Sequence, residues 1–466
     1  MNLSLEIICA QIKGKLIKGP WSMNIQAIST DSRNTAEGSL FFALAGENFD
    51  GHDYVVPALQ NGASAAVISR LWDPFLPLPE GKALIMVEDT LQALQDLARY
   101  YRSQFPIPLI AVTGSVGKTT TKEMIYYCLS SKFNTLKTEA NFNNDIGVPL
   151  TLFRLEKKHQ CAVLEMAMRG PGEILRLVNI ARPTCSVITN VEKVHLEKLG
   201  QLENIAQAKC EILAVLNSED FALINGDHEI LVKEASRYSC RQYTFGYKSH
   251  CDFQIKEVQL DSQGMHIDMD LMGKLAHLHF GLPARPLAPN IAASAGVAFL
   301  MGLDPVSIQS GLDLYQPYGN RLNIYKYPEG GALINDTYNA NPISMAAALE
   351  TARAIAGSGN LVAVLGDMFE LGDYEQKGHI EVGQKAWELK VDTLITVGDR
   401  ARFIAEGAKE AGMPAKNIYY YPEPEHCLDL IRQVWNKKST IVFKASRAME
   451  LEKLVDKTLI PNEGEY

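Results

Sequence analysis

The segment that most constrains the fold of this chain, residues 110–120, reads IAVTGSVGKTT. It passes from an apolar run into a glycine-rich turn and then into a stretch that can form a helix. In such a turn the backbone N–H groups and the N-terminus of the following helix together surround phosphate oxygens. A turn that binds nothing is the competing interpretation, but the flanking strand and helix favour a nucleotide site. The sequence therefore predicts a P-loop at the end of a strand in a parallel sheet.

The glycine turn departs from the usual GxxxxGK[ST] pattern, because Val112 stands where the first glycine is expected and Gly114 follows instead. We expect Lys118 to reach the terminal phosphates and Thr119 to bind magnesium. Residues 436–439 read NKKS and lack the aspartate of a guanine-binding NKxD segment, so ATP is expected rather than GTP. The predicted nucleotide-binding residues of this segment are Thr113, Gly114, Ser115, Val116, Gly117, Lys118, Thr119 and Thr120.

The arrangement of apolar runs predicts an α/β chain of several domains. A length of 466 residues corresponds to about three domains. We expect a small α/β domain over residues 1–88, a central P-loop ATPase domain with a mostly parallel sheet over 89–316, and a Rossmann-like domain over 317–466. The third domain is inferred from apolar strands separated by helix-length segments, which are typical of repeated βαβ units. These strands are expected at ALINDT (332–337), LVAVLGD (361–367), TLITVGD (393–399) and TIVFKAS (440–446).

Two local patterns refine this division. Residues 89–105 form one amphipathic stretch with Asp89 or Thr90 as a plausible cap, and they predict a helix at the start of the central domain. Between residues 240 and 282, alternating apolar and polar residues predict antiparallel strands, which we interpret as a side sheet appended to the central domain.

Composition disfavours several classes of protein. The 45 basic and 54 acidic side chains give a formal net charge of −9, which disfavours nucleic acid as a partner. The eight cysteines form no CxxC pair and have mostly apolar neighbours, so buried free thiols are expected. The first residues carry Glu6 in a short apolar stretch and no basic start, and no apolar run approaches the ~18 residues that span a bilayer. We therefore expect a cytoplasmic protein without a membrane span.

Several longer segments resemble those of the ATP-dependent Mur ligases of peptidoglycan synthesis, and the resemblance extends over essentially the whole chain. The segments are STDSRNTAEGSLFFALAGENFDGHDY (29–54), TGSVGKTTTKEM (113–124), NFNNDIGVPLTL (141–152), LEMAMRGPGEI (164–174), TNVEKVHLEKLG (189–200), AQAKCEI (206–212), INDTYNANPISM (334–345) and LGDMFELGDYEQKGH (365–379). The first of them implies a domain that binds a uridine nucleotide.

The resemblance implies a ligase that activates a carboxylate as an acyl-phosphate and joins it to an amine, with release of ADP and phosphate. Residues 336–342 read DTYNANP where members that add the third peptide residue have DYAHTPD, and the DNPR signature is absent. Addition of D-alanyl-D-alanine to UDP-N-acetylmuramoyl-tripeptide is therefore expected. Separately, we expect a monomer. A family member that adds a single amino acid, and a protein that uses ATP only as a switch, stay open as alternatives.

The same resemblance implies a set of metal ligands. Glu165, at the end of an apolar strand, would join Thr119 on magnesium, and His195 would bind a second magnesium ion. Lys209 would be carbamylated by carbon dioxide to give a further oxygen ligand. Carbamylation needs a neutral amine, so the pKa of Lys209 must lie below its reference value of about 10.4. From residue type alone, a solvated strand-end acid and a solvated helical lysine are the competing interpretations.

The remaining site residues also follow from the resemblance. Asn143 and Asn144 would meet the reacting centre, although a plain turn is the competing interpretation. Arg321 would contact the nucleotide phosphates, Asp336 the ribose and Asn290 the adenine. The predicted catalytic residues are Lys118, Lys209, His195, Asn143 and Asn144; the predicted substrate-binding residues are Ser32, Arg33, Gly51 and His52 for the uridine diphosphate, with Asn339 and Asn341.

Overall fold

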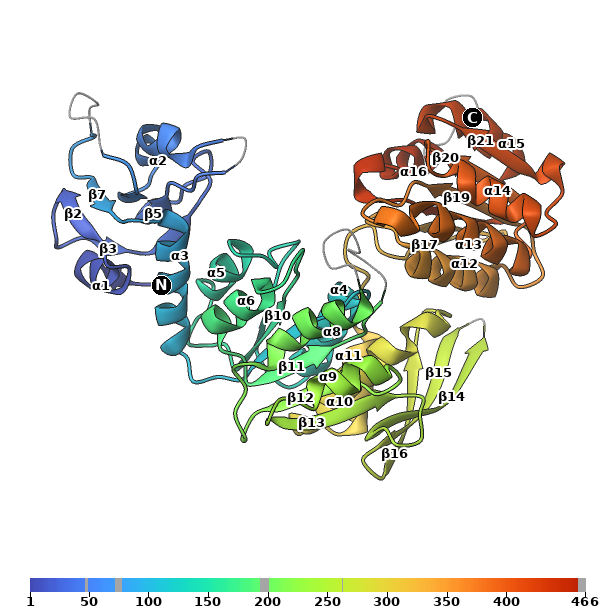
Figure 1. Cartoon of the computed structure of the whole chain (residues 1–466), viewed down its shortest axis with the longest axis horizontal. Coiled ribbons are helices and arrows are strands. Elements are labelled where there is room, and N and C mark those ends of the chain that lie inside the picture. The colour runs from blue at the N-terminus through green and yellow to red at the C-terminus, as the bar shows by residue number, and fades with distance from the viewer. Residues whose placement is uncertain (47–48, 72–77, 193–200, 262, 460–466) are drawn as a thin grey trace.

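The computed structural model describes residues 1–46, 49–71, 78–192, 201–261 and 263–459. The chain forms three successive parts, each with its own main sheet (Figure 1). Within the described ranges, no helix has both the length and the apolar character needed to cross a bilayer. All eight cysteines are buried and free, as their apolar neighbours predicted.

The N-terminal part, blue in Figure 1, is built on a five-stranded sheet with the order β2-β7-β6-β5-β4. Strands β4 to β7 run parallel, whereas β2 is antiparallel to β7. Helices α1 and α2 pack on opposite faces, because alternate residues of the strands point to different cores. The elements are β1 (Leu3–Ser4), α1 (Leu5–Gln11), β2 (Lys15–Lys18), β3 (Asn24–Ile25), β4 (Ala27–Ser29), β5 (Ser39–Phe42), α2 (Val55–Gln60), β6 (Ala65–Ile68) and β7 (Ala83–Met86).

Helix α3 (Thr90–Ser103) connects this part to the next one. Its cap is Asp89, whose Oδ1 accepts from the N–H groups of Leu91 at 2.7 Å and Gln92 at 3.0 Å, so the predicted helix start is confirmed. The apolar face of α3 packs on α1 and β5 as well as on α5 and α6 of the central part. One helix therefore serves two cores, and the predicted boundary between residues 88 and 89 stays a prediction.

The central part contains a nine-stranded sheet with the order β16-β15-β14-β13-β12-β11-β8-β10-β9. The strands from β14 to β9 in this order are parallel, whereas β15 is antiparallel to both of its neighbours, β14 and β16. The predicted antiparallel strands exist, but they continue the main sheet rather than form a separate one, because β14 pairs with β13. The strands are β8 (Leu109–Thr113), β9 (Thr135–Lys137), β10 (Cys161–Glu165), β11 (Cys185–Ile188), β12 (Phe221–Asn225), β13 (Arg241–Gly246), β14 (Phe253–Asp261), β15 (Gly264–Leu271) and β16 (Lys274–Phe280).

Helices cover both faces of the parallel region, which explains why its strands are apolar without alternation. In β8, Leu109 and Ala111 face the core beneath α5 and α6, whereas Ile110 and Val112 face the core beneath α4 and α10. The helices are α4 (Lys118–Ser130), α5 (Gly147–Leu152), α6 (Glu173–Ala181), α8 (Leu202–Cys210), α9 (Glu229–Ala235), α10 (Ala288–Leu300) and α11 (Pro305–Asp313).

The C-terminal part, orange to red in Figure 1, has a six-stranded sheet with the order β17-β18-β22-β19-β20-β21. All pairings except β17 with β18 are parallel, and helices lie on both faces. The elements are β17 (Asn323–Lys326), β18 (Ala332–Asn335), α12 (Pro342–Ala356), β19 (Leu361–Gly366), α13 (Glu375–Glu388), β20 (Thr393–Val397), α14 (Arg402–Glu410), β21 (Ile418–Tyr421), α15 (Leu428–Val434), β22 (Thr440–Lys444) and α16 (Glu452–Leu459). The predicted boundary between residues 316 and 317 stays a prediction.

Candidate active site

The glycine-rich turn lies at the carboxyl end of β8, immediately before α4. Gly117 has a φ of 82°, and a Cβ there would lie 2.4 Å from Nδ2 of Asn290. A Cβ at Gly114 would come within 1.8 Å of Oγ1 of Thr189. Both glycines are therefore required by close neighbours as well as by backbone conformation. The contact with Thr189 explains why glycine stands at position 114, two residues after the usual first glycine of the motif.

Residues that follow β11 hold the turn in place. Oγ1 of Thr189 donates to the carbonyl of Val116 at 2.7 Å, and Oδ1 of Asn190 accepts from the N–H of Val116 at 2.9 Å. The N–H of Ser115 donates to the carbonyl of Asn190 at 3.1 Å. The peptide groups of Val116 are thus engaged within the protein, and the turn is preorganised. Sequence reasoning did not single out Thr189 or Asn190, although both stand at the end of an apolar strand.

Lys118 folds back over the turn. Its Nζ donates to the carbonyls of Gly114 at 2.9 Å and Ser115 at 3.3 Å, so the charge lies above the turn. Desolvation lowers the pKa of Lys118, the charge of Glu165 opposes this change and the charge of Arg321 adds to it. The pKa of Lys118 therefore depends on Glu165 of the central part and on Arg321 of the C-terminal part.

Oxygen atoms that could bind a metal ion lie beside α4. Oγ1 of Thr119 donates to Oε2 of Glu165 at 2.8 Å, and Nδ2 of Asn143 donates to Oε1 of the same carboxylate at 2.8 Å. Glu165 is 3% exposed, and its backbone N–H donates to Oγ1 of Thr138 at 3.0 Å. The predicted pair of Thr119 and Glu165 is therefore brought together, with Asn143 as a third member.

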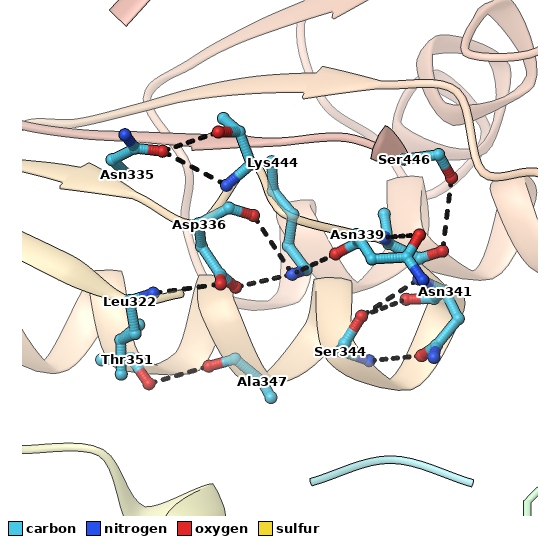
Figure 2. A network of polar contacts seen from close by, with 12 residues as sticks. Leu322, Asn335, Asp336, Asn339, Asn341, Ser344, Ala347, Thr351, Lys444 and Ser446 are labelled. Atoms are coloured by element: carbon cyan, nitrogen blue, oxygen red, sulfur yellow. Dashed lines mark hydrogen bonds and ion pairs between the residues drawn. The ribbon is translucent and has the colours of Figure 1, made fainter. Parts of the chain in front are cut away.

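The C-terminal part supplies a second polar network at the ends of β18 and β22 (Figure 2). Lys444 is 2% exposed, and its Nζ lies 2.6 Å from Oδ2 of Asp336 and donates to the carbonyl of Asn339 at 2.9 Å. Oδ1 of Asp336 accepts from the N–H of Leu322 at 3.1 Å. Sequence reasoning named Asp336 and missed Lys444, although the lysine ends a strand that it had predicted.

Asn341 caps α12 at the edge of the same network. Its Oδ1 accepts from the N–H of Ser344 at 2.8 Å, and Oγ of Ser344 accepts from the N–H of Asn341 at 3.0 Å, which forms a reciprocal capping box. Oδ1 of Asn339 accepts from the N–H of Ala340 at 2.9 Å. Both predicted substrate-binding asparagines therefore shape the backbone at the start of α12.

Arg321 is held by an aromatic ring. Its guanidinium carbon lies 4.0 Å from the ring centroid of Tyr338, an arrangement suited to a cation–π contact. Its Nε atom is buried and has no hydrogen-bond partner among the described residues. A buried guanidinium nitrogen without a partner is a place for an anionic ligand.

A cavity of about 270 Å³ lies between the P-loop and the C-terminal part. It brings together most of the predicted nucleotide residues from two parts of the chain. The predicted residues in its lining are Ser115, Val116, Gly117, Lys118, Thr119, Thr120, Glu165, Asn290, Arg321, Asp336, Asn339 and Asn341, and Lys444 also lines it. Thr113 and Gly114 precede this group along the chain, and Oγ1 of Thr113 donates to the carbonyl of Met166 at 2.9 Å.

Nδ2 of Asn290 lies 2.8 Å from Oγ1 of Thr121 and 3.3 Å from the carbonyl oxygen of Gly117. Oδ1 of Asn144 accepts from the N–H groups of Ile146 and Gly147, so this side chain organises the start of α5. Asn290 and Asn144 thus have structural partners of their own.

Lys209 is buried on α8, with 1% of its surface exposed. Its pKa is lowered well below the ordinary value by desolvation first and by the charge of Lys118 second, while Cys210 acts in the opposite direction. A lowered pKa favours the neutral form of the amine, which is the form that carbamylation requires. His195, the predicted ligand of a second magnesium ion, lies outside the described residues.

The predicted uridine-nucleotide residues lie in the N-terminal part, outside the cavity. Arg33 forms a two-point ion pair with Asp31, at 2.9 and 2.8 Å, which lowers the pKa of Asp31 to about 2. The carbonyl of Ser32 accepts from Asn61 at 2.9 Å.

His52 is fixed on both ring nitrogens. Its Nδ1 lies 2.6 Å from Oδ1 of Asp50, and its Nε2 accepts from the N–H of Ser69 at 2.9 Å. Desolvation lowers the pKa of His52, and the charge of Asp53 opposes this. A Cβ on the neighbouring Gly51 would lie 2.6 Å from the backbone nitrogen of Leu44, which keeps this loop close to the sheet.

Comparison with known families decides the assignment of this chain. Its sequence matches the Mur ligase middle domain over residues 112–298, the Mur ligase glutamate ligase domain over 320–447 and the catalytic domain of the Mur ligase family over 24–102. The chain belongs to the Mur ligase family. The predicted family membership is confirmed, and the chain is therefore a ligase.

Relatives of this Mur ligase match it over nearly its full length. The UDP-N-acetylmuramoyl-tripeptide–D-alanyl-D-alanine ligase of Bacillus subtilis strain 168 is 37% identical, with 97% of each chain covered. The crystal structure of MurF from Acinetobacter baumannii superimposes with a TM-score of 0.88 at 30% identity and covers 98% of this chain and 99% of that one. MurF from Thermotoga maritima in complex with ADP gives a TM-score of 0.82 at 29% identity, over 93% and 97% of the two chains. The predicted α/β fold class is confirmed.

Proposed function

We propose that this Mur ligase uses ATP to add D-alanyl-D-alanine to UDP-N-acetylmuramoyl-tripeptide, giving the pentapeptide precursor of peptidoglycan in the cytoplasm, with ADP and phosphate as the other products. The name of its relative in Bacillus subtilis supports this reaction. The observation that carries the proposal is the cavity in which Lys118, Arg321 and the Thr119–Glu165 pair meet.

The first half-reaction is transfer of the γ-phosphoryl group of ATP to the tripeptide carboxylate. A carboxylate is a poor electrophile, and phosphorylation turns one of its oxygens into a leaving group. Catalysis of such a transfer depends on positioning and charge neutralisation. We assign Lys118 and Arg321 to the phosphate charges, since both are cationic, line the cavity and come from the central and the C-terminal part respectively.

The donor set beside α4 fits magnesium. The hydroxyl of Thr119 and the carboxylate of Glu165 are hard oxygen ligands held 2.8 Å apart, and Mg²⁺ typically takes one or two such protein ligands together with phosphates. When bound, the ion would neutralise charge on the phosphates. Asn143 would act as an orienting group, because its amide holds the second oxygen of Glu165.

Lys209 and His195 are proposed to hold a second magnesium ion, with Lys209 as its carbamate. The amine of Lys209 would attack carbon dioxide, form an N–C bond and lose a proton. Burial and the charge of Lys118 favour the neutral amine needed for this step.

Of the two predicted catalytic asparagines, Asn143 is the stronger candidate for contact with the reacting groups. The side chain of Asn144 is instead engaged with the backbone at the start of α5.

The remaining assignments follow the walls of the cavity. Asp336 is proposed to bind the ribose and Asn290 to lie beside the adenine, with the P-loop residues 113–120 around the phosphates. Asn339 and Asn341 are proposed to contact the substrates. In the N-terminal part, Ser32, Arg33, Gly51 and His52 are proposed to hold the uridine diphosphate. We propose that the enzyme is a monomer.

The test is product formation by the purified chain. Phosphate release would be followed with ATP, Mg²⁺, UDP-N-acetylmuramoyl-tripeptide and D-alanyl-D-alanine, and the pentapeptide product identified by mass spectrometry. Replacing the dipeptide with single amino acids distinguishes a family member that adds one residue. The proposal predicts a new amide bond only with the dipeptide, and absence of any amide product would overturn it.

A further inference from the structure

The linker between α11 and β17, residues 314–322, reads LYQPYGNRL and joins the central part to the C-terminal part. Tyr318 stands in the middle of this linker and is partly buried. Its hydroxyl accepts from the backbone N–H of Ala140 at 2.9 Å, although the two residues lie 178 positions apart in the chain. Tyr318 therefore attaches the linker to the loop that follows β9.

This loop, residues 138–143, is called the asparagine loop below, because it ends with Asn143, whose Nδ2 donates to Oε1 of Glu165 at 2.8 Å. At its start, Oγ1 of Thr138 accepts from the N–H of Glu165 at 3.0 Å. At its end, the carbonyl of Asn143 accepts from the N–H of Ala167 at 2.9 Å. Both ends are fixed beside β10, so the direction in which Asn143 points depends on the backbone between them.

Ala140, in the middle of the asparagine loop, has an unfavourable backbone conformation. Its φ of 46° lies in the left-handed region, which crowds the Cβ of any residue except glycine. Ala140 occupies the second position of a turn that is closed by a hydrogen bond from the N–H of Phe142 to the carbonyl of Glu139 at 3.1 Å. Turns with a positive φ at this position favour glycine, asparagine and aspartate. The hydrogen bond to Tyr318 therefore stabilises a turn that an alanine disfavours.

Lys122 of α4 fixes the start of the asparagine loop. It is fully buried, and its Nζ donates to the carbonyl of Thr138 at 2.8 Å and lies 2.6 Å from Oε1 of Glu123. The same Nζ lies 5.3 Å from the ring centroid of Tyr318, within the range of a cation–π contact. Tyr318 thus contacts the middle of the loop through its hydroxyl and, through its ring, the lysine that holds the start of the loop.

The next residues of the linker contact the C-terminal part instead. The carbonyl of Asn320 accepts from the N–H of Tyr338 at 3.0 Å, and the ring of Tyr338 holds the guanidinium of Arg321. Tyr318 is therefore the point at which this linker is attached to the central part, three residues before the arginine that is proposed to bind phosphate.

We propose that Tyr318 is a positioning residue of this ligase: by holding Ala140, its hydroxyl keeps Asn143 directed at Glu165 and thereby orders the proposed magnesium site. This inference rests on the proposed function, in which Glu165 binds the ion. Within the described part of the chain, Tyr318 does not line the nucleotide cavity, so it acts through the backbone of the asparagine loop.

The test variant is Tyr318→Phe, which removes the hydroxyl and keeps the ring over Lys122. Calorimetric titration with ADP at varied Mg²⁺ gives the Mg²⁺ concentration at which half of the gain in ADP affinity is reached. This concentration is expected to rise about 3- to 10-fold, because one hydrogen bond of the loop is lost. ADP affinity without Mg²⁺ should stay at the wild-type value. Hydrogen–deuterium exchange of residues 138–143 in the metal-free protein should become faster by a similar factor.

Ala140→Gly tests whether the effect passes through the loop. Glycine adopts a φ of 46° without crowding a Cβ, so the turn then needs less support from the hydroxyl. Added to Tyr318→Phe, it is expected to restore part of the lost Mg²⁺ affinity. Damage elsewhere in the linker would not respond to this change.

Tyr325→Phe is the matched control, because Tyr325 is a tyrosine of β17 that is 42% exposed. It should keep the wild-type Mg²⁺ dependence and exchange rates. Wild-type values in Tyr318→Phe, or a loss that Ala140→Gly leaves unchanged, would overturn the positioning role. Failure of wild-type enzyme to form any amide bond would overturn the proposed function, whereas these binding and exchange measurements would still decide the role of Tyr318.

Discussion

Nζ of Lys444 lies 2.6 Å from Oδ2 of Asp336 and joins two strands of the C-terminal sheet at the wall of the nucleotide cavity. The lysine is 2% exposed, so its charge is compensated by this carboxylate and by the carbonyl of Asn339 rather than by water. The ion pair therefore contributes both to the fold and to the site.

Lys444→Met is expected to destabilise the protein by about 3 kcal/mol, because it leaves the Asp336 carboxylate without its cation. It should also raise KM for ATP, since the ordered wall of the cavity is lost. Urea unfolding and steady-state kinetics measure the two effects. The exposed Lys416→Met is the control; equal stability of the two variants would contradict the structural role of the pair.

Glu165→Gln is expected to lower kcat by about 100-fold or more and to raise the Mg²⁺ concentration needed for half-maximal activity. The substitution keeps the size of the side chain and removes the negative charge that lies 2.8 Å from Oγ1 of Thr119. Phosphate release at varied Mg²⁺ measures both quantities. Glu139→Gln, at an exposed glutamate paired with Arg154, should behave as wild type. An unchanged Mg²⁺ dependence in Glu165→Gln would remove this residue from the metal site.

Lys209→Ala is expected to abolish turnover, and small carboxylic acids such as acetate should restore part of it by supplying the missing oxygen ligand. The reason is that the buried Lys209 is proposed to act as a carbamate rather than as an amine. Phosphate release with and without added acid is the measurement. Lys233→Ala, on the exposed side of α9, should need no rescue. Normal activity of Lys209→Ala without added acid would contradict the carbamate assignment.

Gly114→Ala is expected to weaken ADP binding at least about 10-fold and to destabilise the fold by about 1–3 kcal/mol. A Cβ at this position would lie 1.8 Å from Oγ1 of Thr189, the hydroxyl that holds the P-loop turn. Calorimetric titration with ADP and thermal unfolding are the measurements. Gly281→Ala is the control, because its added Cβ meets no atom within 4 Å. Wild-type ADP affinity in Gly114→Ala would show that the contact is not required.

Local patterns in the sequence predicted the central elements of the fold. The P-loop, the cap at Asp89 and the buried parallel strands each depend on residues close together in the chain. One edge strand was missed: β21 (Ile418–Tyr421) has only four residues, and its partly buried tyrosines do not alternate with polar residues. The pairing of β14 with β13 depends on sheet register, which composition does not encode.

The candidate site was predictable where a motif or a resemblance covered it. The Lys444–Asp336 pair was not, because its members lie 108 residues apart and meet only when β18 and β22 become neighbours. Thr189 and Asn190 were missed because their role is to bind the backbone of another loop. For Asn143 and Asn144, a plain turn was the competing interpretation. The contacts of Asn144 with the backbone N–H groups of Ile146 and Gly147 agree with it.

His379 gives the stability a defined pH dependence. It is fully buried on α13, its Nε2 accepts from the N–H of Met368 at 3.0 Å, and its Nδ1 lies 2.7 Å from the carbonyl oxygen of Glu375. Desolvation lowers its pKa from the ordinary 6.5, with Arg400 acting in the same direction and Asp367 and the Glu375 contacts opposing. The neutral ring is therefore the form that fits the folded state.

Because the folded pKa lies below the unfolded one, the stabilising contribution is complete above about pH 6.5 and is lost as the pH falls through the folded pKa. Unfolding in urea at about pH 7.5 and about pH 5.5 should show a lower free energy of unfolding at the lower pH, with part of the loss due to this residue. His379→Gln should have a smaller pH slope, since glutamine can accept from Met368 without titrating. His426→Gln, at an exposed histidine, should keep the wild-type slope; the same slope in both variants would show that acid destabilisation arises elsewhere.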